Sequence, residues 1–212
     1  ALRLFSAALG ALLVLLAFAI AATIFPGRLH LALGAAAFVA FLPMHLALAA
    51  SVNNDALAEV LLAAVLLLSI RYVRKIVVEA QSPRAASVLL LGLLLGLALV
   101  TKVSAYVAAP VALAAPLIGW YESRRQGNSP IHVSRFTGHV LLIAGPALLI
   151  ALPWYARNAA VYGHLDILAR RWHDTVVVGQ LRTSELLAQV GLGAVLERFI
   201  VWSHDSFWGV FG

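Results

Sequence analysis

The 212-residue sequence contains no cysteine and few charged side chains. The lack of cysteine excludes disulfide bonds and thiol-based catalytic or metal sites. Charged residues make up 11% of the chain, whereas soluble domains carry roughly 25%. Because 63% of the residues are hydrophobic, we predict an integral membrane protein that crosses the bilayer several times.

The sequence also lacks a P-loop, a G-x-S-x-G motif, a C-x-x-C pair and any nucleic-acid-binding signature. Its formal net charge of +6 does not by itself indicate a nucleic-acid partner, because membrane proteins concentrate Lys and Arg in short cytoplasmic loops. We therefore expect membrane lipids, and no nucleic acid, among its partners.

Apolar runs long enough to cross a bilayer follow one another along the chain. We predict six transmembrane helices, over residues 4–27, 29–50, 55–72, 85–101, 103–121 and 136–152. Pro43 predicts a kink in the second helix, and Pro153 predicts the end of the sixth. Gly92 and Gly96 have the G-x-x-x-G spacing that allows helices to approach closely in lipid. The predicted fold class is an all-α, polytopic bundle of transmembrane helices.

The chain becomes more polar after Pro153. We divide it into a helix bundle over 1–153, an extracytoplasmic or interfacial segment over 154–205 and the start of a further transmembrane helix over 206–212. Within the middle segment, residues 185–202 predict an amphipathic helix at the membrane interface. Since the sequence begins and ends within apolar stretches, we expect it to be part of a longer protein.

Two short basic loops predict the orientation of the bundle. The loops after the third and fifth predicted helices contain Arg71, Arg74, Lys75 and Arg84, and Arg124, Arg125 and Arg135, respectively. The positive-inside rule places both loops in the cytoplasm. Because successive helices alternate in direction, Asp55, Lys102 and Arg157 are then predicted to share the extracytoplasmic side.

Two carboxylates open the third predicted helix. Asp55 and Glu59 are four residues apart, about one helical turn, and therefore lie on one face. Carboxylates at the end of a membrane helix are costly unless they face water, a cation or the protein interior. We predict Asp55 as a catalytic and metal-binding residue and Glu59 as a substrate-binding residue. Helix capping by Asn53, Asn54 and Asp55 is an alternative interpretation of the same stretch.

Cations on the same predicted side favour a phosphate ligand. Lys102 follows an apolar helix, and Arg157 lies at the predicted depth of the lipid headgroups, where a guanidinium can bind phosphate in a bidentate manner. We predict both as phosphate-binding residues, together with the neighbouring Tyr155 and Asn158 as substrate-binding residues. Alternatively, Lys102 is an interfacial anchor and Tyr155 belongs to an aromatic belt.

Three His–Asp pairs are weak candidates for a metal site. They are His164 with Asp166, His173 with Asp174 and His204 with Asp205. No H-E-x-x-H pattern accompanies them, so we do not predict zinc. The predicted cofactor is a hard divalent cation, Mg²⁺ or Mn²⁺, held by Asp55 and a lipid phosphate.

Short motifs in a characteristic order carry a family resemblance. Asn53-Asn54-Asp55 opens a helix, and it is followed by GLALVTK over 96–102, LPWYARN over 152–158, Tyr162-Gly163 and SFWG over 206–209. In this order the motifs resemble the multi-spanning GT-C glycosyltransferases. The resemblance is greatest to the bacterial branch related to protein mannosyltransferases and to the aminoarabinose transferases of lipid A.

The resemblance implies an enzyme of the bacterial inner membrane that takes a sugar from a polyprenyl-phosphate donor. Such enzymes pass the sugar to an acceptor at the extracytoplasmic face, with a carboxylate of the first extracytoplasmic loop as general base. Asp55 matches a second acid that aids metal or phosphate binding. Residues 1–50 contain no Asp or Glu, so the main base is expected outside this sequence or is absent from the protein.

Two other functions stay open at this point. A non-catalytic transmembrane subunit of a larger membrane assembly is consistent with the missing loop acid. A secondary transporter is consistent with proline-interrupted helices, although the polar groups gather at one end of the predicted bundle and the sequence shows no inverted repeat.

Overall fold

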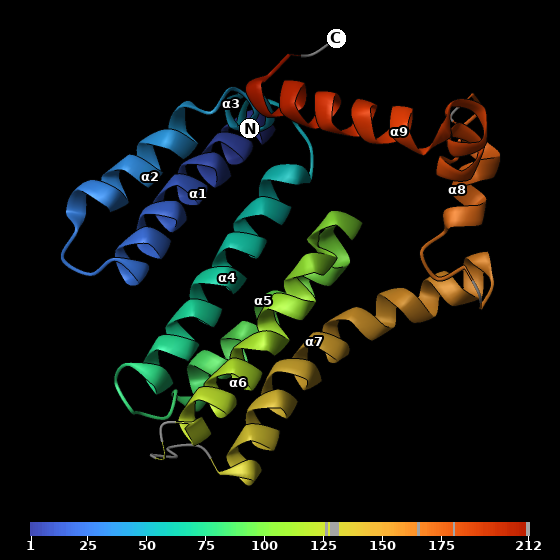
Figure 1. The fold of residues 1–212 in the computed structure, drawn as a ribbon. Coiled ribbons are helices and arrows are strands. Elements are labelled where there is room, and N and C mark those ends of the chain that lie inside the picture. The colour runs from blue at the N-terminus through green and yellow to red at the C-terminus, as the bar shows by residue number, and fades with distance from the viewer. Residues whose placement is uncertain (126, 128–131, 165, 180, 211–212) are drawn as a thin grey trace.

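The computed structural model describes residues 1–125, 127, 132–164, 166–179 and 181–210, which contain helices and no strand. The helices, shown in Figure 1, are α1 (Leu2–Ile24), α2 (Leu29–Phe41), α3 (Pro43–Ala50), α4 (Asp55–Val77), α5 (Ala85–Thr101), the 3₁₀ helix η1 (Val103–Val107), α6 (Ala108–Arg125), α7 (Val133–Tyr162), α8 (Arg170–Val176) and α9 (Thr183–Trp208). The predicted all-α class is confirmed.

Several of these helices are long and apolar enough to cross a membrane. Within the described ranges they are α1, α4, the continuous unit Val103–Arg125, α7 and α9. Helices α2 and α3 together make one more candidate, bent by 59°. The bend lies at Leu42, the residue before Pro43, because a proline disfavours a helical conformation of its predecessor. Both the predicted kink and the predicted multi-pass bundle are confirmed.

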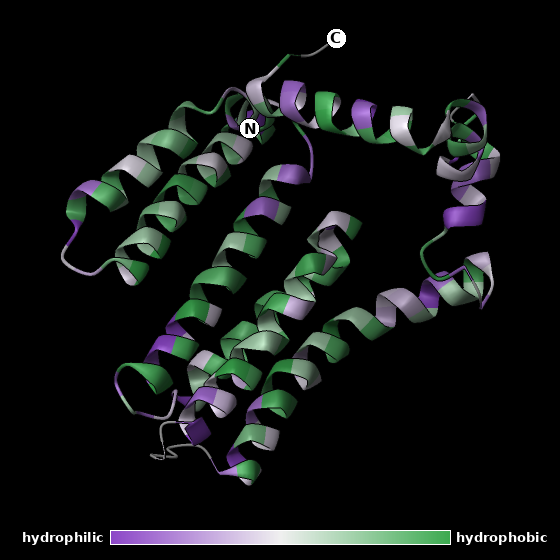
Figure 2. Cartoon of the chain, viewed as in Figure 1, coloured by the Kyte–Doolittle hydropathy of each residue, from purple (hydrophilic) through white to green (hydrophobic). Residues whose placement is uncertain are grey.

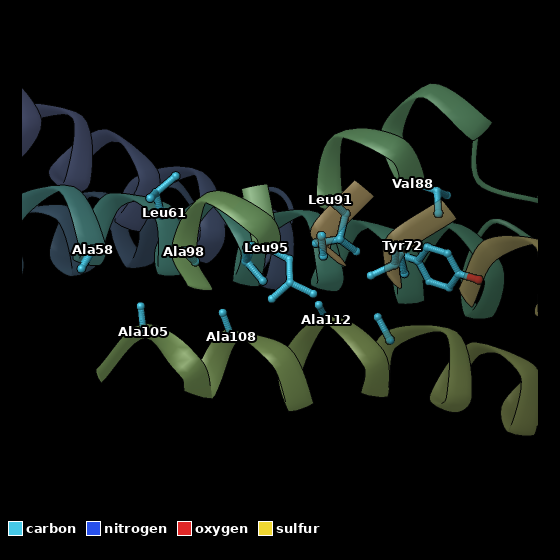
Figure 3. Packing of buried hydrophobic residues seen from close by; sticks show 14 of the residues in the cluster. Ala58, Leu61, Tyr72, Val88, Leu91, Leu95, Ala98, Ala105, Ala108 and Ala112 are labelled. Carbon is cyan, nitrogen blue, oxygen red and sulfur yellow. The ribbon is translucent and has the colours of Figure 1, made fainter. Parts of the chain in front are cut away.

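Small side chains hold α4, α5 and α6 close together. Figure 3 shows Ala105, Ala108 and Ala112 of η1 and α6 facing the buried side chains of α4 and α5. Of the opposing residues, Leu95 and Ala98 are almost completely buried. Lipid tails are as apolar as the helices, so helix association depends on this close van der Waals packing.

Gly92 and Gly96 bring α5 directly against α7. A Cβ atom at Gly92 would lie 2.6 Å from the carbonyl oxygens of Leu142 and Ile143, and one at Gly96 would lie 2.9 Å from the side chain of Ile150. Only glycine fits this contact without a shift of the backbone. The predicted packing role of the G-x-x-x-G spacing is therefore confirmed.

Large apolar side chains cover the outside of the bundle, and polar residues gather at the two ends of α4 (Figure 2). Leu4, Phe41 and Leu149 expose 77%, 79% and 76% of their surface. Soluble monomers rarely present extensive apolar patches to water. This surface is that of a protein embedded in lipid.

Helix α7 extends beyond its predicted end. It continues through Pro153 to Tyr162, so the prediction that Pro153 ends the sixth helix is wrong. Proline is tolerated inside membrane helices because local adjustment and neighbouring groups satisfy the carbonyl that loses its partner. Trp154, Tyr155 and Arg157 therefore lie on a continuous helix and not in a loop.

Helix α9 includes the predicted amphipathic stretch 185–202 and continues further. Ser206, Phe207 and Trp208 form its last turn and do not begin a separate helix, and residues 211–212 of that predicted segment lie outside the described residues. Gly191, with φ 79° and ψ 164°, breaks the helix near its start. Figure 1 shows α9 running across the end of the bundle at which α4 begins, where Phe207 contacts Phe38 with ring centroids 6.2 Å apart.

Candidate functional site

Asp55 and Lys102 form an ion pair at one end of the bundle. The Lys102 ammonium donates to Oδ1 of Asp55 across 47 residues of sequence. The side chain of Asp55 keeps 28% of its surface exposed, and that of Lys102 keeps 37%, so a ligand can reach the pair from outside. The prediction that these two residues lie at the same end of the bundle is confirmed. The extracytoplasmic location of this end stays a prediction.

The backbone around the two residues brings their side chains together. Helix α5 ends at Thr101, and Lys102 is extended, with φ −160° and ψ 145°, before η1 begins. Asn54 Nδ2 donates to the carbonyl oxygen of Thr101 at 3.0 Å, and the N–H of Asp55 donates to Oδ1 of Asn53 at 3.0 Å. The Asn54 side chain thus ties α4 to α5 and makes no capping hydrogen bond. Helix capping alone does not account for this stretch.

Glu59 faces a different neighbour. Its Oε2 atom lies 4.0 Å from Nδ1 of His45 in α3, one turn away from the contact that Asp55 makes with Lys102. The substrate-binding role of Glu59 stays a prediction, and its described ion-pair partner is a histidine and not a lysine.

A cavity of about 230 Å³ lies beside Lys102. Its lining includes the side chains of Tyr106 from η1 and of Trp154, Asn158 and Tyr162 from α7. Sites that enclose a drug-sized molecule measure roughly 300–1,000 Å³. This cavity is therefore of a size to hold a phosphate group or part of a sugar.

Asn158 lines this cavity and hydrogen-bonds to the segment that follows α7. The residue is buried, its Nδ2 donates to the carbonyl oxygen of Ile167 at 3.1 Å, and its Oδ1 accepts from Arg157 at 3.2 Å. The guanidinium of Arg157 lies 5.5 Å from the ring centroid of Trp154, which is within the range of a cation–π contact. Arg157 thus lies next to the cavity wall, and its described contacts do not include Asp55 or Lys102.

Tyr155 contacts a residue that lines the cavity. Its hydroxyl donates to the hydroxyl of Tyr106 at 2.6 Å and lies 3.2 Å from the carbonyl oxygen of Leu99. Tyr106 itself lines the cavity. The structure thus places the Tyr155 hydroxyl against that of Tyr106, and the predicted role of Tyr155 in substrate binding stays a prediction.

Three aromatic cavity residues are missing from the predicted binding set. Trp154 and Tyr162 fit the pattern of an interfacial aromatic belt. From sequence, that pattern cannot be distinguished from residues that line a cavity. The sequence signal for Tyr106 is its position four residues after Lys102. That spacing places two residues on one face only in a regular α-helix. Here η1 is a 3₁₀ helix.

The His–Asp pairs do not form a metal centre. Among the described residues, no group of three His, Asp or Glu side chains comes together in a metal-binding arrangement. His204 lies beside Asp205, and His173 beside Asp174, as separate exposed pairs.

Asp166 caps helix α8. Its buried carboxylate accepts hydrogen bonds from the backbone N–H groups of Arg171 at 3.0 Å and Trp172 at 3.2 Å. Desolvation disfavours the charged form, but these N–H donors outweigh it and hold the pKa of Asp166 below its usual value. The role of this residue in the structure is to order the segment that follows α7.

Comparison with known proteins decides the family. The family model of the dolichyl-phosphate-mannose-protein mannosyltransferases matches residues 1–169. The chain belongs to this mannosyltransferase family. The matched region contains the Asp55–Lys102 pair and every residue that lines the adjoining cavity. No curated protein and no solved structure matches the chain.

Membership in the mannosyltransferase family defines the general chemistry. Its members are membrane glycosyltransferases that use sugars carried on a polyprenyl phosphate. Membrane lipids and a lipid-linked sugar donor are therefore the partners of this class of protein.

Proposed function

We propose that this protein transfers a sugar from a polyprenyl-phosphate donor to an acceptor hydroxyl at the extracytoplasmic face of a bacterial inner membrane. The observation that carries the proposal is the Asp55–Lys102 ion pair beside a cavity of about 230 Å³, in a chain of the mannosyltransferase family.

In the proposed reaction, the bond between the anomeric carbon of the sugar and the phosphate oxygen breaks. A bond to the acceptor oxygen forms, the acceptor proton passes to a base, and the polyprenyl phosphate leaves. Negative charge grows on the phosphate during this step, so fixed positive groups beside it lower the barrier.

Lys102 is proposed to supply that positive charge. An ammonium has three hydrogen-bond donors, and Asp55 occupies one of them. The other donors are available to phosphate oxygens that enter the cavity. Asp55 orients the ammonium toward the cavity mouth, and Arg157 adds a second cation at the wall formed by Trp154.

A divalent cation at Asp55 stays a prediction. Mg²⁺ or Mn²⁺ binds oxygen ligands, and Asp55 supplies a carboxylate at which Lys102 already occupies Oδ1. The cation would therefore share this carboxylate with Lys102 or displace it, with the donor phosphate as a further ligand.

The test is transfer of a labelled sugar from a polyprenyl-phosphate donor by the full-length protein in lipid. We expect Lys102→Gln to lower kcat by about 100-fold, as the loss of one transition-state donor does in other enzymes. Asp55→Asn should lower it by a similar factor, because the ammonium loses its orientation.

A matched control is Arg125→Gln, which removes an exposed cation whose ion-pair partner among the described residues is Glu122, at 3.8 Å. Its turnover should stay within twofold of the unmodified protein. Equal, near-normal turnover in the Asp55 and Lys102 variants would remove both residues from the mechanism. A folded wild-type protein without transfer activity would favour the non-catalytic subunit.

A further inference from the structure

A second polar cavity lies at the opposite end of the bundle. It measures about 560 Å³, and its polar lining comes from the last turns of α4 and the loop that follows. Asp55 and Lys75 are 20 residues apart on α4, which corresponds to about 30 Å along the helix axis. This equals the hydrocarbon thickness of a bilayer, so the second cavity lies at the headgroup level of the other leaflet.

The charges around this cavity are strongly unbalanced. Its lining includes four cations and one carboxylate: Arg71, Arg74, Lys75, Arg84 and Glu79. Lys75 pairs with Glu79 at 2.6 Å, and Arg74 donates to the carbonyl oxygen of Thr23 at the end of α1. Among the ion pairs of the described residues, none involves Arg71 or Arg84. Two guanidinium groups therefore line this cavity without an ion-pair partner among the described residues.

An apolar groove of about 520 Å³ adjoins the basic cavity. The two share Thr23 and Arg74 in their linings, so the groove adjoins the cations. Its walls are mostly apolar residues of α1, α4 and α6, and along α4 and its C-cap they run from Leu66 to Val78. From Arg74 to Leu66 the groove extends over 8 residue steps, about 12 Å toward the bilayer centre, which lies within the roughly 15 Å hydrocarbon depth of one leaflet.

We propose that this paired cavity and groove bind an anionic phospholipid. The phosphate lies between Arg71 and Arg84, where planar guanidinium groups bind two phosphate oxygens at once. One acyl chain lies in the groove between α4 and α6. A zwitterionic lipid carries its own ammonium group and gains less from these two cations. Basic pockets between transmembrane helices bind anionic headgroups in this way.

The proposal is independent of sugar transfer, because the site lies a bilayer thickness from Lys102. The experiment uses the full-length protein in nanodiscs of phosphatidylcholine with increasing phosphatidylglycerol. Native mass spectrometry counts the retained phosphatidylglycerol molecules, and thermal unfolding measures the stabilisation. We expect Arg71→Gln and Arg84→Gln each to weaken retention about fivefold, and the double variant about 25-fold.

Arg125→Gln is the matched control, since it removes one cation at the same end of the bundle and does not line the cavity. It should retain phosphatidylglycerol as the unmodified protein does. Equal weakening by Arg125→Gln would overturn the proposal in favour of general surface attraction. An equal thermal shift from inorganic phosphate in phosphatidylcholine nanodiscs would overturn it in favour of a free anion.

A third variant tests the groove. Ala114→Trp places a bulky side chain in the groove on α6 without changing charge. We expect it to reduce phosphatidylglycerol retention at least threefold while the protein still unfolds cooperatively. Unchanged retention in this folded variant would contradict an acyl chain between α4 and α6.

Discussion

The ammonium of Lys102 lies against the carboxylate of Asp55, and this contact joins the end of α5 to the start of α4. Both side chains are roughly one-third exposed, so the pair contributes little to stability, about 1 kcal/mol or less. In the function proposed above, the pair matters because it orients a cation that lines the cavity.

A charge swap separates the structural role of this pair from its role in transfer. In Asp55→Lys/Lys102→Asp the ion pair can form again with the charges reversed, so we expect the Tm to return close to that of the unmodified protein. Transfer should stay at least about 100-fold reduced, because a carboxylate then faces the donor phosphate. Thermal unfolding and the transfer assay on one preparation check this, and recovered transfer would contradict it.

The absence of cysteine from residues 1–212 allows a direct test of the predicted orientation, once any cysteine outside them is replaced by serine. Val52→Cys and Gln81→Cys place single thiols at exposed positions beyond opposite ends of α4. In intact cells, a membrane-impermeant maleimide should label the thiol at position 52. The thiol at position 81 should be labelled only after the cells are permeabilised. The reverse pattern would place Asp55 and Lys102 on the cytoplasmic side.

The contact between α5 and α7 predicts a strong effect at Gly92. Gly92→Ala brings a methyl group to within 2.6 Å of two backbone carbonyl oxygens of α7, and the strain should cost about 2 kcal/mol. Gly145→Ala is the control, because its Cβ has no neighbour within 4 Å and alanine favours the helix. Thermal unfolding in detergent should show a lower Tm for the first variant and an unchanged or higher Tm for the second.

A buried hydrogen bond between α4 and α7 predicts a second cost. Nδ1 of His139 lies 2.7 Å from the hydroxyl of Tyr72, and both residues are buried. Tyr72→Phe leaves this nitrogen without its partner, which should cost about 1–3 kcal/mol. Tyr121→Phe, at a site with 62% exposure, should change the stability by less than about 0.5 kcal/mol. Similar unfolding of the two variants would show that the hydrogen bond contributes nothing.

The cap on α8 predicts a dependence on pH. The pKa of Asp166 is lower in the folded protein than its usual value of 3.8, so its stabilisation is complete above about pH 3.8 and is lost as the pH falls through the folded pKa. The protection factors of the Arg171 and Trp172 amides, which compare each rate with the intrinsic rate at the same pH, should fall over that range. In Asp166→Ala exchange should already be fast at neutral pH, whereas Asp205→Asn, at an exposed side chain, should keep the protection. Slow exchange in Asp166→Ala would contradict the cap.

The general architecture was predictable because lipid leaves a membrane chain few choices. Every backbone polar group in the bilayer needs an internal partner, so long apolar runs become helices. The kink before Pro43 and the contact at Gly92 follow from local geometry alone, since proline restricts its predecessor and glycine removes the Cβ atom. The end of α7 was not predictable in this way, because neighbouring groups permit a proline that would end an isolated helix.

The sequence by itself determined that this chain lies in a membrane, that polar residues flank its apolar helices and that Asp55 and Lys102 belong to the same end of the bundle. Only the tertiary structure decided that they touch, that Glu59 lies by His45 and that Tyr106, Trp154 and Tyr162 line the cavity. The reason is physical: hydrophobic runs encode depth along the bilayer normal residue by residue. The neighbours of a side chain across the bundle depend instead on the rotation and packing of whole helices.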